Sequence, residues 1–132
     1  EGRIAEKARE ELNKTGIKNE LATVNTRIST HERTHLAILG GAAASGIRYT
    51  YASGPDGGRY AVGGSIKVDL QPVAGNPEET IRRARRIRRA ALTPGSPSPA
   101  DMRVAADAYR LEKEAKREMK SSQSGQSISL FI

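Results

Sequence analysis

The stretch from Lys18 to Leu39 reads KNELATVNTRISTHERTHLAIL. Its apolar side chains recur every three or four residues, a rhythm that marks one face of an α-helix, at Leu21, Val24, Ile28 and Ile38. His31 and His35 fall on the same rhythm. The pattern predicts a helix that ends at Gly40-Gly41, because glycine readily adopts the left-handed cap conformation, with both histidines on its buried face.

On the N-terminal side, residues 3–13 are mostly good helix formers. The sequence Asn13-Lys14-Thr15-Gly16 is typical of a helix end, and it predicts a separate first helix.

On the C-terminal side, residues 47–70 have the alternation of strands. Residues 47–51 and 59–62 predict two strands around the turn sequence Gly54-Pro55-Asp56-Gly57, and residues 65–70 predict a third. Gly63-Gly64 indicates a bulge or sharp bend. We expect a small antiparallel meander of two or three strands.

Two further helices follow. Asn76-Pro77-Glu78-Glu79 combines a cap, a proline at the first helical position and acids in the first turn, so it starts a helix that reaches about Leu92. Ser98 caps the last helix, which we expect to end near Lys120. The chain is therefore expected to be a single α+β domain over residues 1–120, a minimal zincin-like fold, with a polar and then apolar tail over residues 121–132.

Composition limits the functions open to the chain. Only 36% of the 132 residues are hydrophobic, which predicts a thin, helix-rich core with much alanine and isoleucine. There is no cysteine, which excludes disulfide scaffolds, Cys-type zinc ribbons and cysteine nucleophiles. No apolar run is long enough to span a membrane, and the lack of an apolar leader makes the cytoplasm the default expectation.

The chemistry is concentrated in His31-Glu32-Arg33-Thr34-His35. Histidines four residues apart lie one above the other on a helix and can share one metal ion. Glu32 lies about 100° further round the helix, where it can reach a water activated by the metal. This is the H-E-x-x-H arrangement of zinc hydrolases, in which the glutamate is the general base. It predicts Zn²⁺ as cofactor and a zinc-dependent metallopeptidase that cleaves peptide bonds with a zinc-activated water. The simpler alternative is two satisfied core histidines beside a surface glutamate.

The third protein ligand must be sought elsewhere. The longer motif of metzincins fails, because Ile38 and Gly41 stand where glycine and histidine are needed. Both histidines of the chain are already in the motif, so we expect a carboxylate. We favour Glu78 first and Asp69 next, although Glu78 would also suit the helix dipole. The other downstream acids that we consider are Asp56, Glu79, Asp101 and the acids of the last helix.

Several blocks together resemble the SprA-related family of bacterial metalloproteases. The resemblance runs from about residue 27 to about residue 118 and rests on residues 31–36, Tyr49-Thr50-Tyr51, Gly54-Pro55-Asp56-Gly57, residues 59–64, Val68-Asp69, Pro77-Glu78 and Thr80-Ile81-Arg82. It implies a bacterial zinc peptidase. The family usually has glutamate after the double glycine, where this chain has Ser65, so one possible carboxylate ligand is missing here.

Two other features suggest functions. Tyr60 lies near the expected cleft and could stabilise the oxyanion of the reaction, as could Arg59, whereas sheet packing is the commoner role for Tyr49 and Tyr51. Residues 82–89 carry six arginines, and the chain has a net charge of +7. The alternative function is therefore a non-catalytic, zinc-stabilised binding module that contacts nucleic acid or acidic partners through Arg82–Arg89. The arginines could equally form a solvated face paired with acids at 112–118. No aromatic residue interleaves with them, so nucleic acid is not expected to be the main partner; a peptide or protein substrate is.

Overall fold

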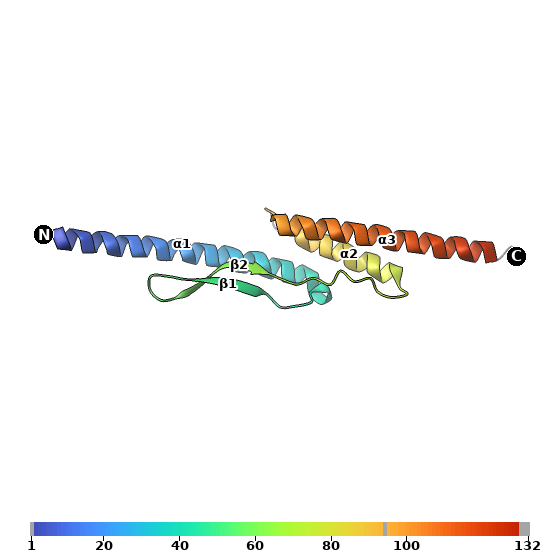
Figure 1. Cartoon of the computed structure of the whole chain (residues 1–132), viewed down its shortest axis with the longest axis horizontal. Helices are drawn as coiled ribbons and strands as arrows, with labels where there is room; N and C mark the ends of the chain where they lie inside the picture. Colours follow the sequence, from blue (N-terminus) through green and yellow to red (C-terminus); the bar gives the residue numbers. More distant parts are fainter. Residues whose placement is uncertain (1, 94, 130–132) are drawn as a thin grey trace. The chain divides into compact units, whose positions relative to one another are not determined.

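The computed structural model describes residues 2–93 and 95–129. Its elements, in order, are helix α1 (Gly2–Leu39), a short 3-10 helix η1 (Gly40–Ala42), strands β1 (Arg48–Ser53) and β2 (Arg59–Ser65), and helices α2 (Pro77–Leu92) and α3 (Pro99–Ser129) (Figure 1). The predicted α+β class is confirmed. The chain divides into two compact parts. The first part consists of Glu1–Arg33 and Ile47–Ile66, and the second part consists of Thr34–Gly46 and Lys67–Ile132.

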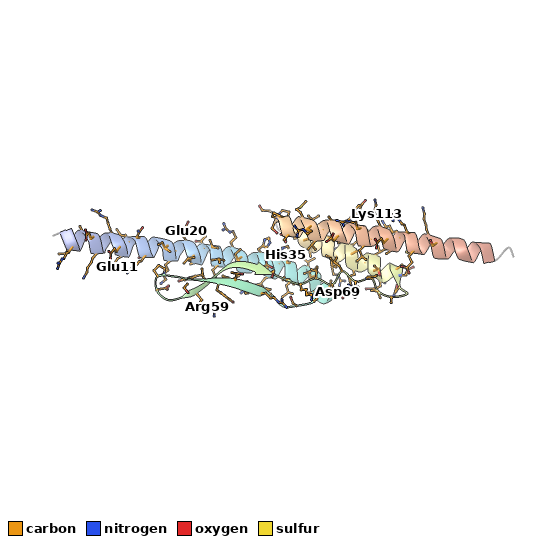
Figure 2. All side chains as sticks on the ribbon, in the orientation of Figure 1. Glu11, Glu20, His35, Arg59, Asp69 and Lys113 are labelled. Carbon is orange, nitrogen blue, oxygen red and sulfur yellow. The ribbon has the colours of Figure 1, made fainter. Side chains whose placement is uncertain are left out.

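Helix α1 is continuous, so the predicted break at residues 13–16 is wrong. One glycine inside a helix costs only about 1 kcal/mol relative to alanine, which the flanking helix formers can offset. Thr15 also stays within the helix, where its hydroxyl donates a hydrogen bond to the carbonyl of Glu11. The exposed glutamates Glu11 and Glu20 are labelled along this segment in Figure 2.

In the first part, an antiparallel hairpin of β1 and β2 packs beside α1. The Asn25 side chain accepts a hydrogen bond from the backbone N–H of Ala61 at 2.7 Å, which fixes β2 against the helix. The pairing register shifts so that Thr50 faces Gly63 and Tyr51 faces Ala61. Val62 is thus the extra residue of a bulge, directly before the glycine pair that predicted one.

Of the two or three strands that we expected, this sheet contains two, and residues 66–70 do not form a third one in it. The backbone of this segment instead pairs with the chain that follows α1: Ala44 donates to the carbonyl of Lys67, and Asp69 donates to the carbonyl of Ala42. A single antiparallel bridge joins Ala43 to Val68. Alternation in the sequence predicted an extended segment but could not say which segment it would pair with.

The second part is built on α2 and α3, which lie side by side (Figure 1). Helix α2 has a buried strip that includes Ile81, Ala84, Ile87 and Ala91, all at most 8% exposed. Small residues of α3 pack in the same core, including Ala105, Ala108 and Ala115. Alanine at these positions allows the helices to approach closely, which explains how a chain with few large apolar residues builds a core.

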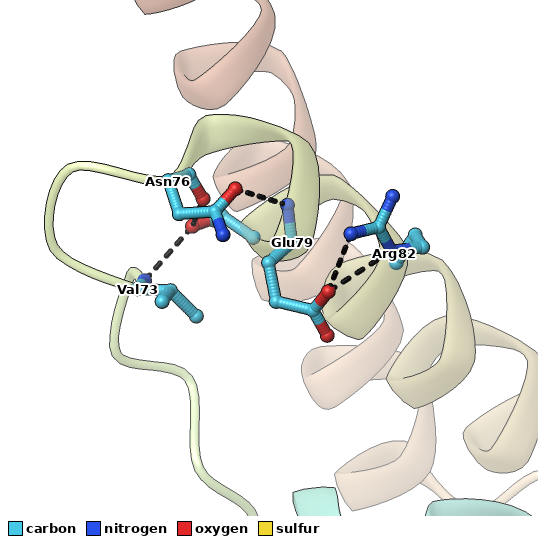
Figure 3. A network of polar contacts seen from close by, with 5 residues as sticks. Val73, Asn76, Glu79 and Arg82 are labelled. Carbon is cyan, nitrogen blue, oxygen red and sulfur yellow. Dashed lines mark hydrogen bonds and ion pairs between the residues drawn. The ribbon is translucent and has the colours of Figure 1, made fainter.

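The starts of both helices follow the sequence signals. The Asn76 side chain accepts from the backbone N–H of Glu79, and Glu79 in turn pairs with Arg82 (Figure 3). The Ser98 hydroxyl caps α3 by accepting a hydrogen bond from the backbone N–H of Asp101. Helix α3 runs past Lys120 to Ser129, longer than expected. Residues 130–132 of the predicted tail lie outside the described residues.

Within the described residues, no helix has the length and apolar character needed to cross a membrane.

Candidate metal centre

Helix α1 brings together the three residues that the sequence singled out. His31, Glu32 and His35 each offer one ligand atom, and these atoms all lie within 4.8 Å of one another. The helix alone accounts for this, because His31 and His35 are four positions apart and Glu32 and His35 are three apart, and such pairs are neighbours on the surface of a helix. The cluster is one that could hold a metal ion.

Glu32 is a buried residue, with 6% of its surface exposed. The surface position that the alternative gave to Glu32 is therefore wrong, whereas its satisfied histidines are not contradicted. The buried side of α1 in this region runs through Glu32, His35 and Leu39, while His31 is half-buried. A carboxylate is seldom buried unless it meets a cation or strong hydrogen-bond donors, so its burial beside two imidazoles makes the cluster a candidate metal centre.

Strand β2 comes very close to the Glu32 side chain. A Cβ atom added at Gly64 would lie 2.7 Å from Cγ of Glu32 and 3.4 Å from Cδ1 of Tyr49, the residue paired with Gly64 in the hairpin. The φ angle of Gly64 is not positive, so the backbone itself does not demand glycine there. Gly64 is instead required by close approach, because no side chain fits between the strand and Glu32.

His35 is held in one orientation by helix α2. Its Nδ1 lies 2.8 Å from the backbone carbonyl oxygen of Ala90 in α2, and the residue is only 7% exposed. A carbonyl only accepts hydrogen bonds, so Nδ1 carries a proton and donates it. Metal-binding histidines are commonly oriented in this way, with one ring nitrogen bonded to a carbonyl and the other presented to the metal.

The model of the SprA-related family matches residues 1–129, nearly the whole chain. The chain belongs to the SprA-related family. The resemblance seen between residues 27 and 118 is thus confirmed and extends to the N-terminal half of α1. No curated protein and no solved structure matches the chain.

In this SprA-related chain, the two carboxylates that we favoured as the third zinc ligand lie in surroundings that need no metal ion. Asp69 lies with Oδ2 at 3.1 Å from Nη1 of Arg83, and its Oδ1 accepts from the backbone N–H of Gln71. Glu78 is exposed in the first turn of α2, where its charge suits the positive end of the helix dipole. Both roles account for these residues without a metal. Figure 2 labels Asp69 and His35.

Tyr60 is engaged at the turn end of the hairpin. Its hydroxyl donates to Oδ2 of Asp56 at 3.1 Å, and desolvation together with the Asp56 carboxylate raises the pKa of Tyr60. The neighbouring Ala61 bonds to Asn25, which precedes Glu32 by two helical turns, or about 10 Å along α1. The structure therefore gives Tyr60 a hairpin-stabilising contact. Tyr49, by contrast, lies at the level of Glu32.

Two residues that border the cluster were missed or ranked low from the sequence. Gly64 was expected only to bend the strand, and Asp101 was one candidate among several. Asp101 lies beside His35, with its Oδ1 at 3.3 Å from Nε2. The only signal for it in the sequence was its place in the first turn of a helix, which also predicts a simple capping role.

The arginines of α2 are largely paired within the second part. Arg82 pairs with Glu79, Arg83 with Asp69, and both Arg85 and Arg88 with Glu112 of α3. Glu112 is 3% exposed. Burial by itself raises the pKa of Glu112, but the hydrogen bond from Arg85 and the charges of Arg88 and Lys116 outweigh it, so its pKa falls below the ordinary value of 4.5. These pairs favour a structural role for much of the arginine face.

Replacing Glu112 with glutamine is expected to lower the free energy of unfolding by about 1–3 kcal/mol at neutral pH, because two arginines lose their acceptor. The cost stays moderate because the Arg85 and Arg88 side chains are 56% and 35% exposed and can be rehydrated. Since the folded-state pKa is lowered, the contribution of Glu112 is present above the ordinary glutamate pKa and is lost as pH falls through the folded value. Urea denaturation at pH 7 and at pH 3 should therefore show a gap between wild type and Glu112→Gln that closes in acid. An equal gap at both pH values would contradict the ion-pair explanation.

Proposed function

We propose that this SprA-related chain is a zinc-dependent peptidase, with His31 and His35 as zinc ligands and Glu32 as general base. One observation carries the proposal: the ligand atoms of these three residues gather within 4.8 Å on α1, with the Glu32 carboxylate buried among them.

The donor set fits zinc. Imidazole nitrogens and carboxylate oxygens are its usual ligands in catalytic sites, where three protein groups leave one position open. When bound, zinc would supply Lewis-acid polarisation of a peptide carbonyl and make a water available as a nucleophile near neutral pH.

The residues of the chain supply the rest of the reaction. The fixed proton on Nδ1 of His35 leaves Nε2 as the coordinating atom. Glu32 accepts the proton of the attacking water and returns it to the leaving amine, a role for which a carboxylate in a partly desolvated position is suited. The close approach of β2 at Gly64 holds the Glu32 side chain in place. A peptide or protein is the substrate class that this chemistry serves.

The alternative of a nucleic-acid-binding module receives less support. Four of the six arginines between residues 82 and 89 have acidic partners within the second part, which reduces the charge available to phosphates.

The proposal is tested by preparing the wild-type protein free of metal with a chelator and titrating it with zinc. The resulting samples are then assayed on a mixed library of unstructured peptides. We expect hydrolysis to be absent without zinc and to rise with zinc until one ion is bound per chain. Hydrolysis that is unaffected by removing the metal would contradict the proposal, and so would saturating zinc binding with no hydrolysis of any peptide.

A further inference from the structure

His35 and Asp101 turn two potential zinc-ligand atoms toward each other. Nδ1 of His35 donates to the carbonyl of Ala90, which leaves Nε2 as the ring atom that can bind a metal. Nε2 lies 3.3 Å from Oδ1 of Asp101, a carboxylate oxygen that can also bind zinc.

A shared zinc ion fits the spacing of these two atoms. In a tetrahedral zinc site with bonds of about 2.0–2.1 Å, two ligand atoms are separated by about 3.3–3.4 Å. The separation of Nε2 and Oδ1, 3.3 Å, equals this ligand-to-ligand distance. Both side chains are also well shielded, with 9% of His35 and 16% of Asp101 exposed.

We infer that Asp101 is the third protein ligand of the zinc ion, in place of Glu78 or Asp69. The inference rests on the proposed zinc site of His31 and His35, and it completes a set of two imidazoles and one carboxylate. That set leaves a fourth position for water and substrate, as in a catalytic rather than a structural site.

The two oxygens of Asp101 are used differently. Oδ2 accepts from the backbone N–H of Ser98 at 2.9 Å, while the Ser98 hydroxyl accepts from the backbone N–H of Asp101 at 3.0 Å. This reciprocal capping box fixes the carboxylate at the start of α3. Hydrogen bonding of a ligating carboxylate is the usual way in which a metal ligand is oriented. The cap thus holds Oδ1 toward His35.

A purely structural role of Asp101 would give the same contact with His35 without any metal ion. If His35 is protonated on both nitrogens, Asp101 only forms an ion pair with it, and Asp101 contributes nothing to metal binding. The variant Asp101→Asn separates the two cases. Asparagine has the same shape, its oxygen can still accept from Ser98 and its amide can donate to Nε2 of a neutral His35, but an amide is a poor zinc ligand.

The experiment is isothermal titration of metal-free protein with zinc, for wild type and for Asp101→Asn, with circular dichroism to confirm that the variant is folded. We expect the zinc affinity of Asp101→Asn to fall by about 100-fold or more, beyond the 10–100-fold typical of residues that only orient a ligand. Two matched variants should keep the wild-type affinity, Asp69→Asn and Glu78→Gln, which remove the rival carboxylates. Ser98→Ala removes the capping hydroxyl but leaves the carboxylate and its hydrogen bond from the Ser98 backbone N–H, so it should lose clearly less affinity than Asp101→Asn.

Unchanged zinc affinity in a folded Asp101→Asn would overturn the inference and leave the zinc site itself standing. An equal loss in Ser98→Ala would also overturn it, because Asp101 would then act only through the helix start. A wild-type protein that binds no zinc would refute the proposed function and the inference together, so the failures can be told apart.

Discussion

The variant Glu32→Gln is expected to lose peptide hydrolysis by about 10²–10⁴-fold, the usual contribution of a general base, while its zinc affinity stays unchanged. Glutamine keeps the size of the side chain, so the buried position next to Gly64 remains filled. It cannot take a proton from water, so only the proton-transfer step suffers. The measurement is kcat on a cleaved peptide, together with a zinc titration of the same sample.

Glu20→Gln is the matched control for this experiment. Glu20 lies on the same helix but is exposed, and its replacement should change neither quantity. If Glu32→Gln cleaves peptides as fast as the wild type, Glu32 is not the base. If it loses zinc as well as activity, Glu32 holds the metal and the assignment of roles within the cluster is wrong.

The second large effect is expected at Gly64. In Gly64→Ala the new Cβ would lie 2.7 Å from Cγ of Glu32, far inside normal contact, so the glutamate must move. A displacement of about 1 Å at a reacting group can cost about 10²-fold in rate, and we expect a fall in kcat of this order. Zinc affinity should fall much less, because the three atoms nearest to the new methyl group belong to Glu32 and Tyr49.

The adjacent glycine provides a close control. A Cβ at Gly63 would meet Cβ of Thr50 at 3.7 Å, an ordinary contact, so Gly63→Ala should keep nearly full activity. Neither glycine has a positive φ, so both substitutions are compatible with the backbone. Equal activities for the two variants would show that β2 does not position Glu32.

Local signals in the sequence predicted much of this fold. The cap at Asn76 and the start at Ser98 were correct, because each depends on a few neighbouring residues. The break at Gly16 was wrong, because a single glycine weakens a helix without ending it. Whether a third strand would form stayed open, because alternation does not specify a pairing partner, and residues 67–69 bond to the chain after α1.

The candidate site likewise has some residues that local sequence signals predicted and others that they could not. The positions of His31, Glu32 and His35 relative to one another follow from helix geometry, so spacing alone predicted them. Asp101 could not be singled out, because the hairpin and the whole of α2 separate it from His35 in sequence. Glu78 and Asp101 both lie in the first turn of a helix, so their sequence signals are similar. Only the packing of α3 shows that Asp101 lies beside His35. The role of Gly64 likewise depends on how closely β2 approaches α1.

The claim at the centre of this account is that His31 and His35 bind zinc. Titration of metal-free wild-type protein tests it most directly, with His35→Ala measured beside it. We predict saturation at one zinc ion per chain for the wild type and a severe loss of binding for His35→Ala. A folded wild-type protein that takes up no zinc, or a His35→Ala variant that binds it equally well, would contradict the claim.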